Sequence, residues 1–390
     1  MRTFTKVIFI LLQYILILPL HAETTVGIYV AGAGISNYRI NTWSKKYFSV
    51  LEYLDSLKSS NNNTSQLTFL NSDFAYGIDG DNNKLEVYKV DKKLVYDSSP
   101  FVNKLVLEPR LVLIKSYNAH DFDCLYPTYI AAYANELHLI CKYSDDMISI
   151  AVDPNTGLVG NIIGKVDLGD TDPRKVIITD SGEFAYVLEK KTAKVLALAR
   201  TPDRQFIKTA EYGSYALNSS DIVFGPYTLS GKQLIYISDK DSLDISVEML
   251  DPKEDGMLSL INYISIVPYK PLRMALVKTS NSGSFLWVTA TKATKTSDSS
   301  YKQNWLLQYQ IGNNGSLSLV SETEMLFAVG NIVYNSAANS LYITYPFNSG
   351  FAWCPLNKSR TALLSECEYI NSYIHSPVSI ATYDFMGFPM

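Results

Sequence analysis

Histidine, cysteine and charged residues are scarce in this sequence of 390 residues. It contains four histidines and four cysteines, and only 18% of its residues are charged. No cysteine pair has the CxxC spacing of a zinc site, and no P-loop, GxSxG, HExxH or dinucleotide-binding fingerprint is present. No long basic run occurs and the formal net charge is −4, so a nucleic acid is not an expected partner. The sequence therefore predicts neither a metal nor a cofactor.

Long apolar runs are also absent, except at the N-terminus. Arg2 and Lys6 precede an apolar stretch, residues 7–20, that is interrupted only by Gln13. This pattern predicts a signal peptide over residues 1–22, removed after Ala22, and one domain over residues 23–390. An uncleaved anchor is the alternative reading, although the run is short for a full span. We expect a secreted or periplasmic protein with no transmembrane span after cleavage.

The stretch "VDPNTGLVGN", residues 152–161, has relatives along the chain. Each relative has a polar turn followed by a short alternating apolar segment. The first apolar residues after these turns lie about 50 residues apart on average, a spacing typical of propellers, near Phe48, Leu94, Leu158, Phe206, Met257, Leu317 and Leu363.

A strand rich in aromatic residues precedes each turn, and another strand precedes that one. Examples of the former are "FAYVLEK" (184–190) and "LIYISDK" (234–240). Alternation has a period of two, and 28 tyrosines suit half-buried strands. Seven units of four antiparallel strands predict an all-β, seven-bladed β-propeller.

The two ends of the chain indicate how the ring closes. The first unit begins at its second strand, "VGIYVAG", whereas "HSPVSIATYDF" (375–385) resembles an inner strand with no blade after it. We therefore expect the C-terminal strand to complete the first blade and remove a free sheet edge.

The stretches "DPNTGLVG", "IGNNGSLSLV" and "SGEFAYVLEKKTAKVLALAR" resemble the seven-bladed lactonase-type propeller family, which includes 6-phosphogluconolactonase-like proteins. "FAWCPLNKSRTALLSEC" is similar to repeats of secreted bacterial propellers with paired blade cysteines. The resemblance implies a propeller fold and raises lactone hydrolysis as an activity. No catalytic motif of that family is matched residue by residue.

Two polar stretches look like ligand loops but are interpreted as turns. Asp153, Pro154, Asn155 and Gly157 suit the turn between the two outer strands of a blade. In "GIDGDNNKLE" from Gly77, the acidic residues mimic half of a calcium loop. Lys84 stands where such a loop needs its glycine, so a hairpin is expected.

Polar residues in the loops before the inner strands are the candidate ligand-binding residues. In a propeller these loops surround one mouth of the central channel. They also contain Asp123, Asp172 and Lys270, which are kept as secondary candidates. The predicted channel-mouth residues are His120, Asp121, Arg174, Asp221, Arg273 and His375. Solvated loop residues without a ligand are the alternative reading.

The four cysteines suggest disulfides in an oxidising compartment. A turn near Arg360 and Thr361 would place Cys354 opposite Cys367, which predicts a bond between them. Cys124 and Cys141 form the remaining pair, with free buried thiols as the alternative.

Three classes of function remain open. The main prediction is a non-catalytic module that binds an unknown protein or small molecule. The first alternative is a lactonase that uses the channel mouth, with histidine and arginine as candidate base and anion holder. The second is a structural module of the cell envelope. The catalytic residues, the partner and the oligomeric state are not predicted.

Overall fold

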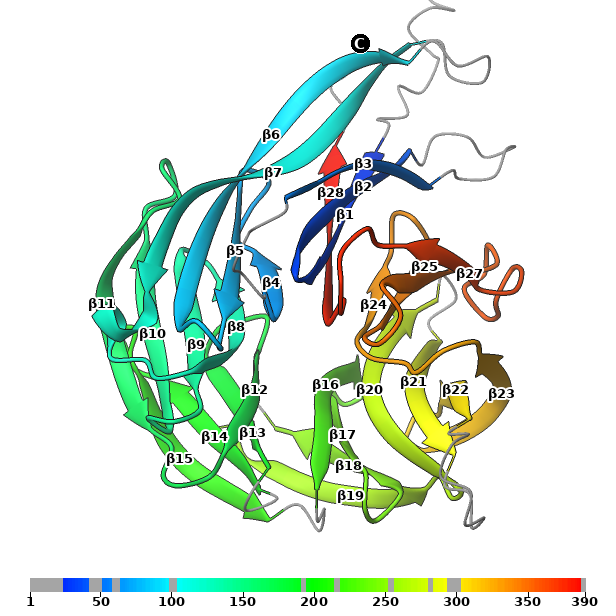
Figure 1. Ribbon diagram of the computed structural model, residues 1–390. Coiled ribbons are helices and arrows are strands. Elements are labelled where there is room, and N and C mark those ends of the chain that lie inside the picture. The colour runs from blue at the N-terminus through cyan, green and yellow to red at the C-terminus, as the bar shows by residue number, and fades with distance from the viewer. Residues whose placement is uncertain are drawn as a thin grey trace, which may run out of the picture.

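Seven sheets surround a central axis in this protein (Figure 1). The structure, a computed structural model, describes residues 24–41, 51–57, 64–97, 104–190, 194–213, 218–251, 256–279, 283–292 and 303–386. Each sheet has four antiparallel strands, which confirms the predicted seven-bladed propeller. The expected signal peptide, residues 1–22, lies outside the described residues. Within those residues, no helix is long and apolar enough to cross a membrane.

We number the blades from the one that contains the first strand, and each is given from its inner to its outer strand. Blade 1 consists of β28 (Ser379–Met386), β1 (Thr24–Gly32), β2 (Gly34–Asn41) and β3 (Leu51–Leu57), and blade 2 of β4 (Gln66–Phe69), β5 (Phe74–Asp79), β6 (Lys84–Asp97) and β7 (Lys104–Asn118). Blade 3 consists of β8 (Pro127–Tyr133), β9 (Glu136–Cys141), β10 (Asp146–Val152) and β11 (Val159–Asp167). Blade 4 consists of β12 (Pro173–Ile178), β13 (Phe184–Glu189), β14 (Lys194–Arg200) and β15 (Phe206–Gly213).

Blades 5 to 7 follow the same plan, and one short 3-10 helix, η1 (Ala119–Phe122), precedes blade 3. Blade 5 consists of β16 (Ser219–Tyr227), β17 (Gln233–Asp239), β18 (Asp244–Leu250) and β19 (Leu258–Ser265). Blade 6 consists of β20 (Tyr269–Lys278), β21 (Ser284–Lys292), β22 (Asn304–Ile311) and β23 (Leu317–Met325). Blade 7 consists of β24 (Ile332–Asn335), β25 (Ser340–Tyr345), β26 (Gly350–Pro355) and β27 (Glu368–Asn371).

The C-terminal strand closes the ring. β28 pairs antiparallel with β1, and Ile28 lies opposite Thr382 in that register. The first blade therefore takes its inner strand from the end of the chain, as the sequence predicted. This pairing satisfies the backbone groups of β1 that would otherwise form an open edge at the centre of the ring.

The predicted turn at residues 153–157 joins the two outer strands of blade 3. The amide of Gly157 donates to the carbonyl of Asp153 at 2.8 Å, and the Asp153 amide donates to the Leu158 carbonyl at 3.1 Å. Gly157 has a φ of +70°, and a side chain there would place its Cβ 2.2 Å from the ring of Phe74 in blade 2. Both the turn conformation and the packing between blades therefore require glycine.

This turn belongs to a contact that recurs between neighbouring blades. A large side chain on the second strand of one blade reaches the outer turn of the next. Tyr76 donates its hydroxyl to the Gly157 carbonyl at 2.8 Å, and Tyr186 donates to the Gly256 carbonyl at 2.7 Å. Tyr236 bonds to the carbonyl of Gly315 in the same way. The seven side chains at this position, all fully buried, are Tyr29, Tyr76, His138, Tyr186, Tyr236, Trp287 and Tyr342.

The outer hairpin of blade 2 is longer than expected. The sequence pattern placed a turn before Leu94, but Leu94 lies inside β6, which continues to Asp97 and pairs along its length with β7. No glycine, proline or asparagine interrupts residues 85–97, so alternation continues through them. The extension lies across blade 1 (Figure 1), where Arg110 pairs with Asp55 at 2.8 Å.

The predicted disulfide between Cys354 and Cys367 is present, and so is a second one between Cys124 and Cys141, whose pairing the sequence left open. Cys354 on β26 bonds to Cys367, which directly precedes β27. The amide of Arg360 donates to the Asn357 carbonyl at 2.8 Å, so a tight turn lies at the end of this hairpin, as expected. Cys124 bonds to Cys141 and ties the segment after η1 to the end of β9. Each bond therefore lies within or beside a single blade.

The contact between blades can be tested at Tyr76. Replacement by Phe keeps the ring but leaves the buried Gly157 carbonyl without its donor. We expect Tyr76→Phe to lower the free energy of unfolding by about 1 to 2 kcal/mol, measured by urea denaturation. Tyr227→Phe, at a half-exposed ring, is the matched control and is expected to change stability little. Equal stability of the two variants would contradict this role for the hydroxyl.

Candidate functional site

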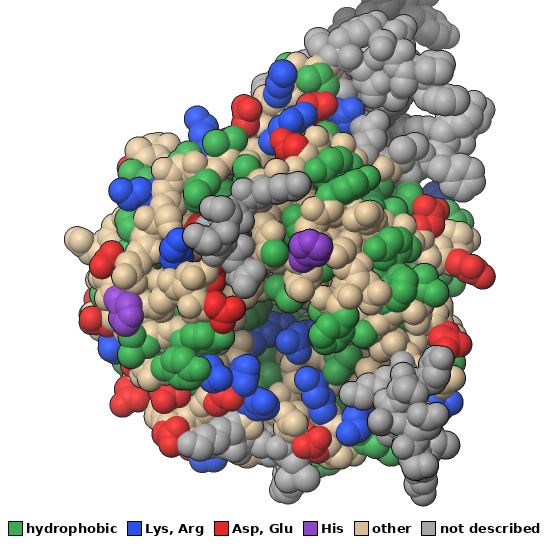
Figure 2. Space-filling view, viewed as in Figure 1, with side chains coloured by type: hydrophobic (Ala, Val, Ile, Leu, Met, Phe, Trp, Pro, Cys, Tyr) green, Lys and Arg blue, Asp and Glu red, His purple; other side chains and the backbone are tan. Residues whose placement is uncertain are grey.

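The centre of the ring contains a cavity of about 720 Å³. Inner strands from all seven blades line it, together with the ends of two second strands. Its charged lining residues all belong to blades 4 to 6, where Asn218, Ser219 and Ser220 at or just before the start of β16 also line it. Figure 2 shows basic side chains gathered in this central hollow. A cavity of this size is in the range of small-molecule sites.

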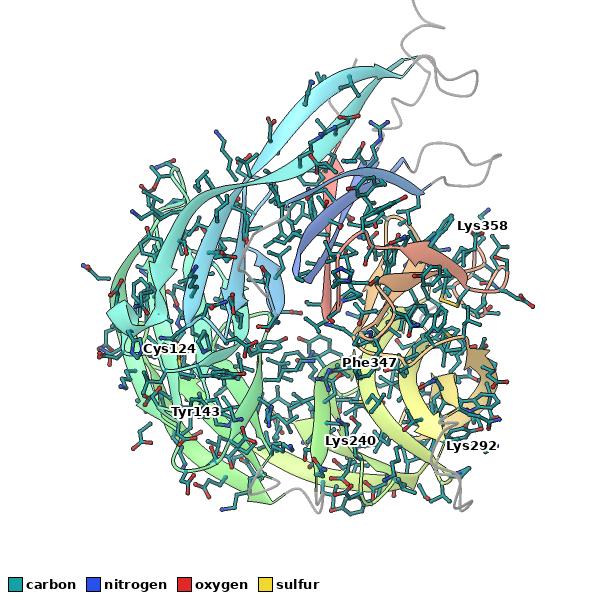
Figure 3. All side chains as sticks on the ribbon, viewed as in Figure 1. Cys124, Tyr143, Lys240, Lys292, Phe347 and Lys358 are labelled. Carbon is teal, nitrogen blue, oxygen red and sulfur yellow. A yellow bond between two sulfur atoms is a disulfide. The ribbon has the colours of Figure 1, made fainter. Side chains whose placement is uncertain are left out.

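Five basic residues and one acidic residue line this cavity. We call the five the cationic mouth: Arg174, Lys175, Lys190, Lys240 and Arg273. Lys190 directly follows β13 and Lys240 directly follows β17, whereas the other three lie on inner strands. Figure 3 shows Lys240 at the edge of the central hollow. Like charges this close together attract anions from solution.

The one acidic lining residue, Asp221, is already engaged. Its carboxylate is almost fully buried, accepts from Lys175 Nζ at 2.7 Å, and accepts from the backbone amide of Met274 at 2.7 Å. Burial alone would lower the pKa of Lys175, but the charge of Asp221 and their hydrogen bond outweigh it, so the pKa is raised. Asp221 thus holds blades 4, 5 and 6 together at the mouth.

The remaining basic side chains keep much of their charge uncompensated. Arg174 pairs with Asp172 at 2.7 Å, and Arg273 donates to the backbone carbonyl of Ser220 at 2.6 Å. A carbonyl fixes the position of a guanidinium without neutralising it. Within the described residues, no carboxylate is paired with the side chains of Lys190 or Lys240.

Lys240 is affected by its neighbours. Partial burial lowers its pKa, and the positive charges of Arg273, Lys190 and Arg174 lower it further. A protonated Lys240 is therefore held in a site that disfavours its charge. Groups perturbed in this way are candidates for functional residues, and an anion bound in the cavity would relieve the repulsion.

The structure separates the six predicted channel-mouth residues into two sets. Arg174, Asp221 and Arg273 line the cavity. His120 and Asp121 lie exposed on η1, because this turn buries Ala119 and Phe122 instead. His375 is exposed, with its ring 3.3 Å from the Ser349 hydroxyl. These three are not among the cavity-lining residues, and a ligand-binding role for any of the six stays a prediction.

The secondary candidates also separate. Asp172 binds Arg174 at the rim, as described above, whereas Asp123 and Lys270 are exposed and do not line the cavity. Within the described part of the chain, no cluster of three or more histidine, cysteine or acidic side chains is arranged to hold a metal ion.

Sequence reasoning missed Lys175, Lys190 and Lys240. Lys190 and Lys240 were part of a repeat that the sequence shows. Lys142, Lys190 and Lys240 directly follow the second strands of blades 3, 4 and 5, one lysine in each blade. Their amides donate to the carbonyls of Tyr126, Asp172 and Asn218 respectively, at 3.0 to 3.2 Å. A basic residue that recurs at one position of a ring must face the same mouth each time. Aligning the sequences of the second strands by their last residue would have identified this recurring lysine.

A buried polar cluster in blade 3 resembles a catalytic arrangement but is not accessible. His138 Nδ1 lies 2.9 Å from the Ser149 hydroxyl, and His138 Nε2 lies 3.6 Å from Glu136. Arg200 and Arg204 from blade 4 bind Glu136. The three blade-3 side chains are buried. This cluster lies between blades 3 and 4, at the position where Tyr76 and Gly157 join blades 2 and 3. It serves as a polar contact between blades.

Comparisons with known proteins agree on the fold. No family model and no curated protein matches this sequence. Among solved structures, the periplasmic gluconolactonase PpgL of Pseudomonas aeruginosa has 12% sequence identity and a TM-score of 0.67, over 92% of this chain and 99% of that one. A Bacteroides fragilis protein with the provisional name 6-phosphogluconolactonase has 12% identity and a TM-score of 0.67, over 94% and 99%.

A protein from Lactobacillus plantarum is similar to the same degree, with 11% identity and a TM-score of 0.67 over 93% of this chain and 99% of that one. At such low identities the likeness shows the fold alone. The chain therefore has the seven-bladed propeller architecture of 6-phosphogluconolactonase-like proteins.

The buried histidine predicts a pH dependence. Burial and the charge of Arg200 lower the pKa of His138 from 6.5 to about 3. The unfolded chain takes up a proton below pH 6.5 and the folded protein does not, so this contribution to stability is lost as the pH falls from 6.5 toward 3. Between pH 7 and pH 5, the free energy of unfolding of the wild type should fall by about 2 kcal/mol more than that of His138→Gln. Urea denaturation at several pH values measures this, and the same change in free energy of unfolding for both proteins would contradict the prediction.

Repulsion within the cationic mouth predicts a stabilising substitution. Lys240→Gln removes one of the crowded charges, so we expect a higher melting temperature than wild type in dilute buffer. The gain should shrink in about 0.5 M NaCl, because salt screens the repulsion. Lys358→Gln, at an exposed lysine of blade 7 (Figure 3), is the control and should show no such change. A destabilised Lys240→Gln would contradict the repulsion.

Proposed function

We propose that this protein is an extracytoplasmic propeller that binds an anionic small molecule at its cationic mouth without converting it. The observation that carries this proposal is the charge of the cavity, in which five basic side chains face one acidic residue that is already paired. An anion would gain charge-assisted hydrogen bonds there. Lys190, Lys240 and Arg273 are the proposed ligand contacts, with Arg174 at the rim.

The same lining argues against hydrolysis. Lactone opening needs a base or an activated water. The described lining includes no histidine, and Asp221 is held by Lys175 and a backbone amide. The candidate histidines of the lactonase alternative, His120 and His375, lie outside the lining. The fold shared with proteins named as lactonases is the specific observation that keeps this alternative worth testing.

The proposed location rests on three observations of different kinds. The N-terminal segment has the pattern of a signal peptide, two disulfides are present, and one protein of similar fold is named as periplasmic. Disulfides persist in oxidising compartments outside the cytoplasm. Exposure to the surroundings of the cell would also give the cavity access to external anions.

Thermal shift and hydrolysis assays on one sample test the proposal. Gluconate and 6-phosphogluconate should raise the melting temperature of the wild type, since a ligand that binds only the folded state stabilises it. Lys240→Ala should reduce the shift strongly and Lys358→Ala should not. Gluconolactone should disappear no faster than without protein.

Two outcomes would contradict the proposal in different ways. No shift with either anion would remove the anion-binding function. Turnover of gluconolactone that Arg273→Ala abolishes, in a variant that still folds, would favour the lactonase alternative instead.

A further inference from the structure

A second cavity, of about 410 Å³, adjoins the cationic mouth. Segments of blades 1, 2 and 3 line it, and Ser65, Thr128, Arg174 and Val378 line both cavities. The two cavities therefore adjoin, with the Arg174 side chain in the lining of both.

The second cavity differs in chemistry from the first. The hydroxyl-bearing residues Thr64, Ser65, Thr128 and Ser376 belong to its lining, together with Asp81 and Tyr126. Apolar side chains are few, and charges other than Asp81 and Arg174 are absent from the described lining. Such a surface suits a ligand with many hydroxyl groups and offers little to an apolar side chain of a peptide.

Asp81 and Tyr126 form the recognisable part of this lining. The Tyr126 hydroxyl donates to Asp81 Oδ1 at 2.9 Å, and the Tyr126 amide donates to Asn83 Oδ1 at 2.8 Å. The Tyr126 ring also packs on Tyr143, with 4.8 Å between ring centroids. Blades 2 and 3 therefore hold this ring in place before any ligand binds, which reduces the entropy lost on binding.

Two glycines allow the backbone to approach closely at this cavity. A Cβ on Gly80 would lie 2.8 Å from the Pro127 carbonyl, and one on Gly32 would lie 2.5 Å from the Ser376 carbonyl. Side chains at either position would push the lining segments apart. The shape of the second cavity thus depends on both glycines.

A carboxylate beside a fixed aromatic ring is the chemistry that recognises a sugar. Asp81 is exposed and can accept hydrogen bonds from sugar hydroxyl groups, and the partly exposed Tyr126 ring can pack against the C–H face of a pyranose. The negative charge of Asp81 disfavours an anion in this cavity, whereas the cationic mouth favours one. The two cavities therefore favour groups of different charge.

From this juxtaposition we infer that the two cavities together bind an acidic oligosaccharide. Its anionic unit occupies the cationic mouth, and an uncharged sugar unit lies in the second cavity against Asp81 and Tyr126. Arg174 lies at the junction between the units. This inference rests on the proposed function, because it takes anion binding at the mouth as given and adds the class of ligand.

Aldonates with and without a sugar attached provide the test. Lactobionate and maltobionate consist of gluconate joined to galactose or glucose. Gluconate alone is therefore their anionic half, and lactose is the uncharged counterpart of lactobionate. By titration calorimetry, we expect at least one of the two disaccharide acids to bind wild type about tenfold more tightly than gluconate does, and lactose to bind weakly. A factor of ten corresponds to about 1.4 kcal/mol.

Variants locate the added affinity. Asp81→Ala and Tyr126→Ala should reduce disaccharide-acid binding to the level of gluconate and leave gluconate binding unchanged. Lys240→Ala should weaken both. Asp180→Ala, at an exposed acidic residue of the β12–β13 turn, is the control for Asp81. Because Asp81 is exposed, its variant carries the test if Tyr126→Ala does not fold.

The possible results separate this inference from the proposed function. Equal affinity for gluconate and both disaccharide acids, or unchanged binding by Asp81→Ala, would overturn the inference and leave anion binding intact. No binding of any of these anions would overturn both. A tetraglutamate peptide that binds more tightly than lactobionate, and whose binding Asp81→Ala strengthens, would replace the saccharide by an acidic peptide.

Discussion

The contact between the second strand of one blade and the outer turn of the next is the interaction on which this ring depends. A four-stranded blade cannot bury both of its faces alone, so its stability comes from its neighbours. Tyr76, Tyr186 and Tyr236 combine a buried ring with a hydrogen bond to a turn carbonyl. The ring fills space between two blades, and the hydroxyl satisfies a backbone carbonyl of the neighbouring blade.

Blade 3 solves the same problem with charge. Glu136 and His138 occupy the place of an aromatic pair, and Arg200 and Arg204 of blade 4 replace the glycine turn. Buried charges require complete pairing, because desolvation is costly. Here the two arginines of blade 4 supply the charge that the buried Glu136 of blade 3 requires. The polar version makes the order of blades 3 and 4 distinctive within a set of similar repeats.

Much of the fold was predictable because its signals are local. The turn at Asp153–Gly157 and the unpaired strand at each end of the chain are visible in short stretches. The long β6–β7 hairpin was not, because alternation alone does not say where a strand ends when no turn residue interrupts it. At the site, loop position identified Arg174, Asp221 and Arg273 among the lining residues. It did not give the direction of His120 or Asp121, which depends on how the η1 turn buries its own apolar residues.

The cationic mouth follows from the same repeat that builds the ring. Lys142, Lys190 and Lys240 occupy one position in successive blades, and rotation about a common axis brings such positions to one face. Lys190 and Lys240 reach the cavity, whereas Lys142 lies over the rings of Tyr126 and Tyr143 at 5.8 and 5.2 Å. Blade 3 therefore turns a basic position into part of an aromatic surface. The change from charge to aromatic surface around the ring gives the mouth a direction, with an anion-attracting side at blades 4 to 6 and a side rich in hydroxyl groups at blades 1 to 3. The crowded lysines and arginines reduce the stability of the protein. The contacts between second strands and outer turns lie away from the mouth and offset this loss, so the ring can keep the asymmetric mouth in place.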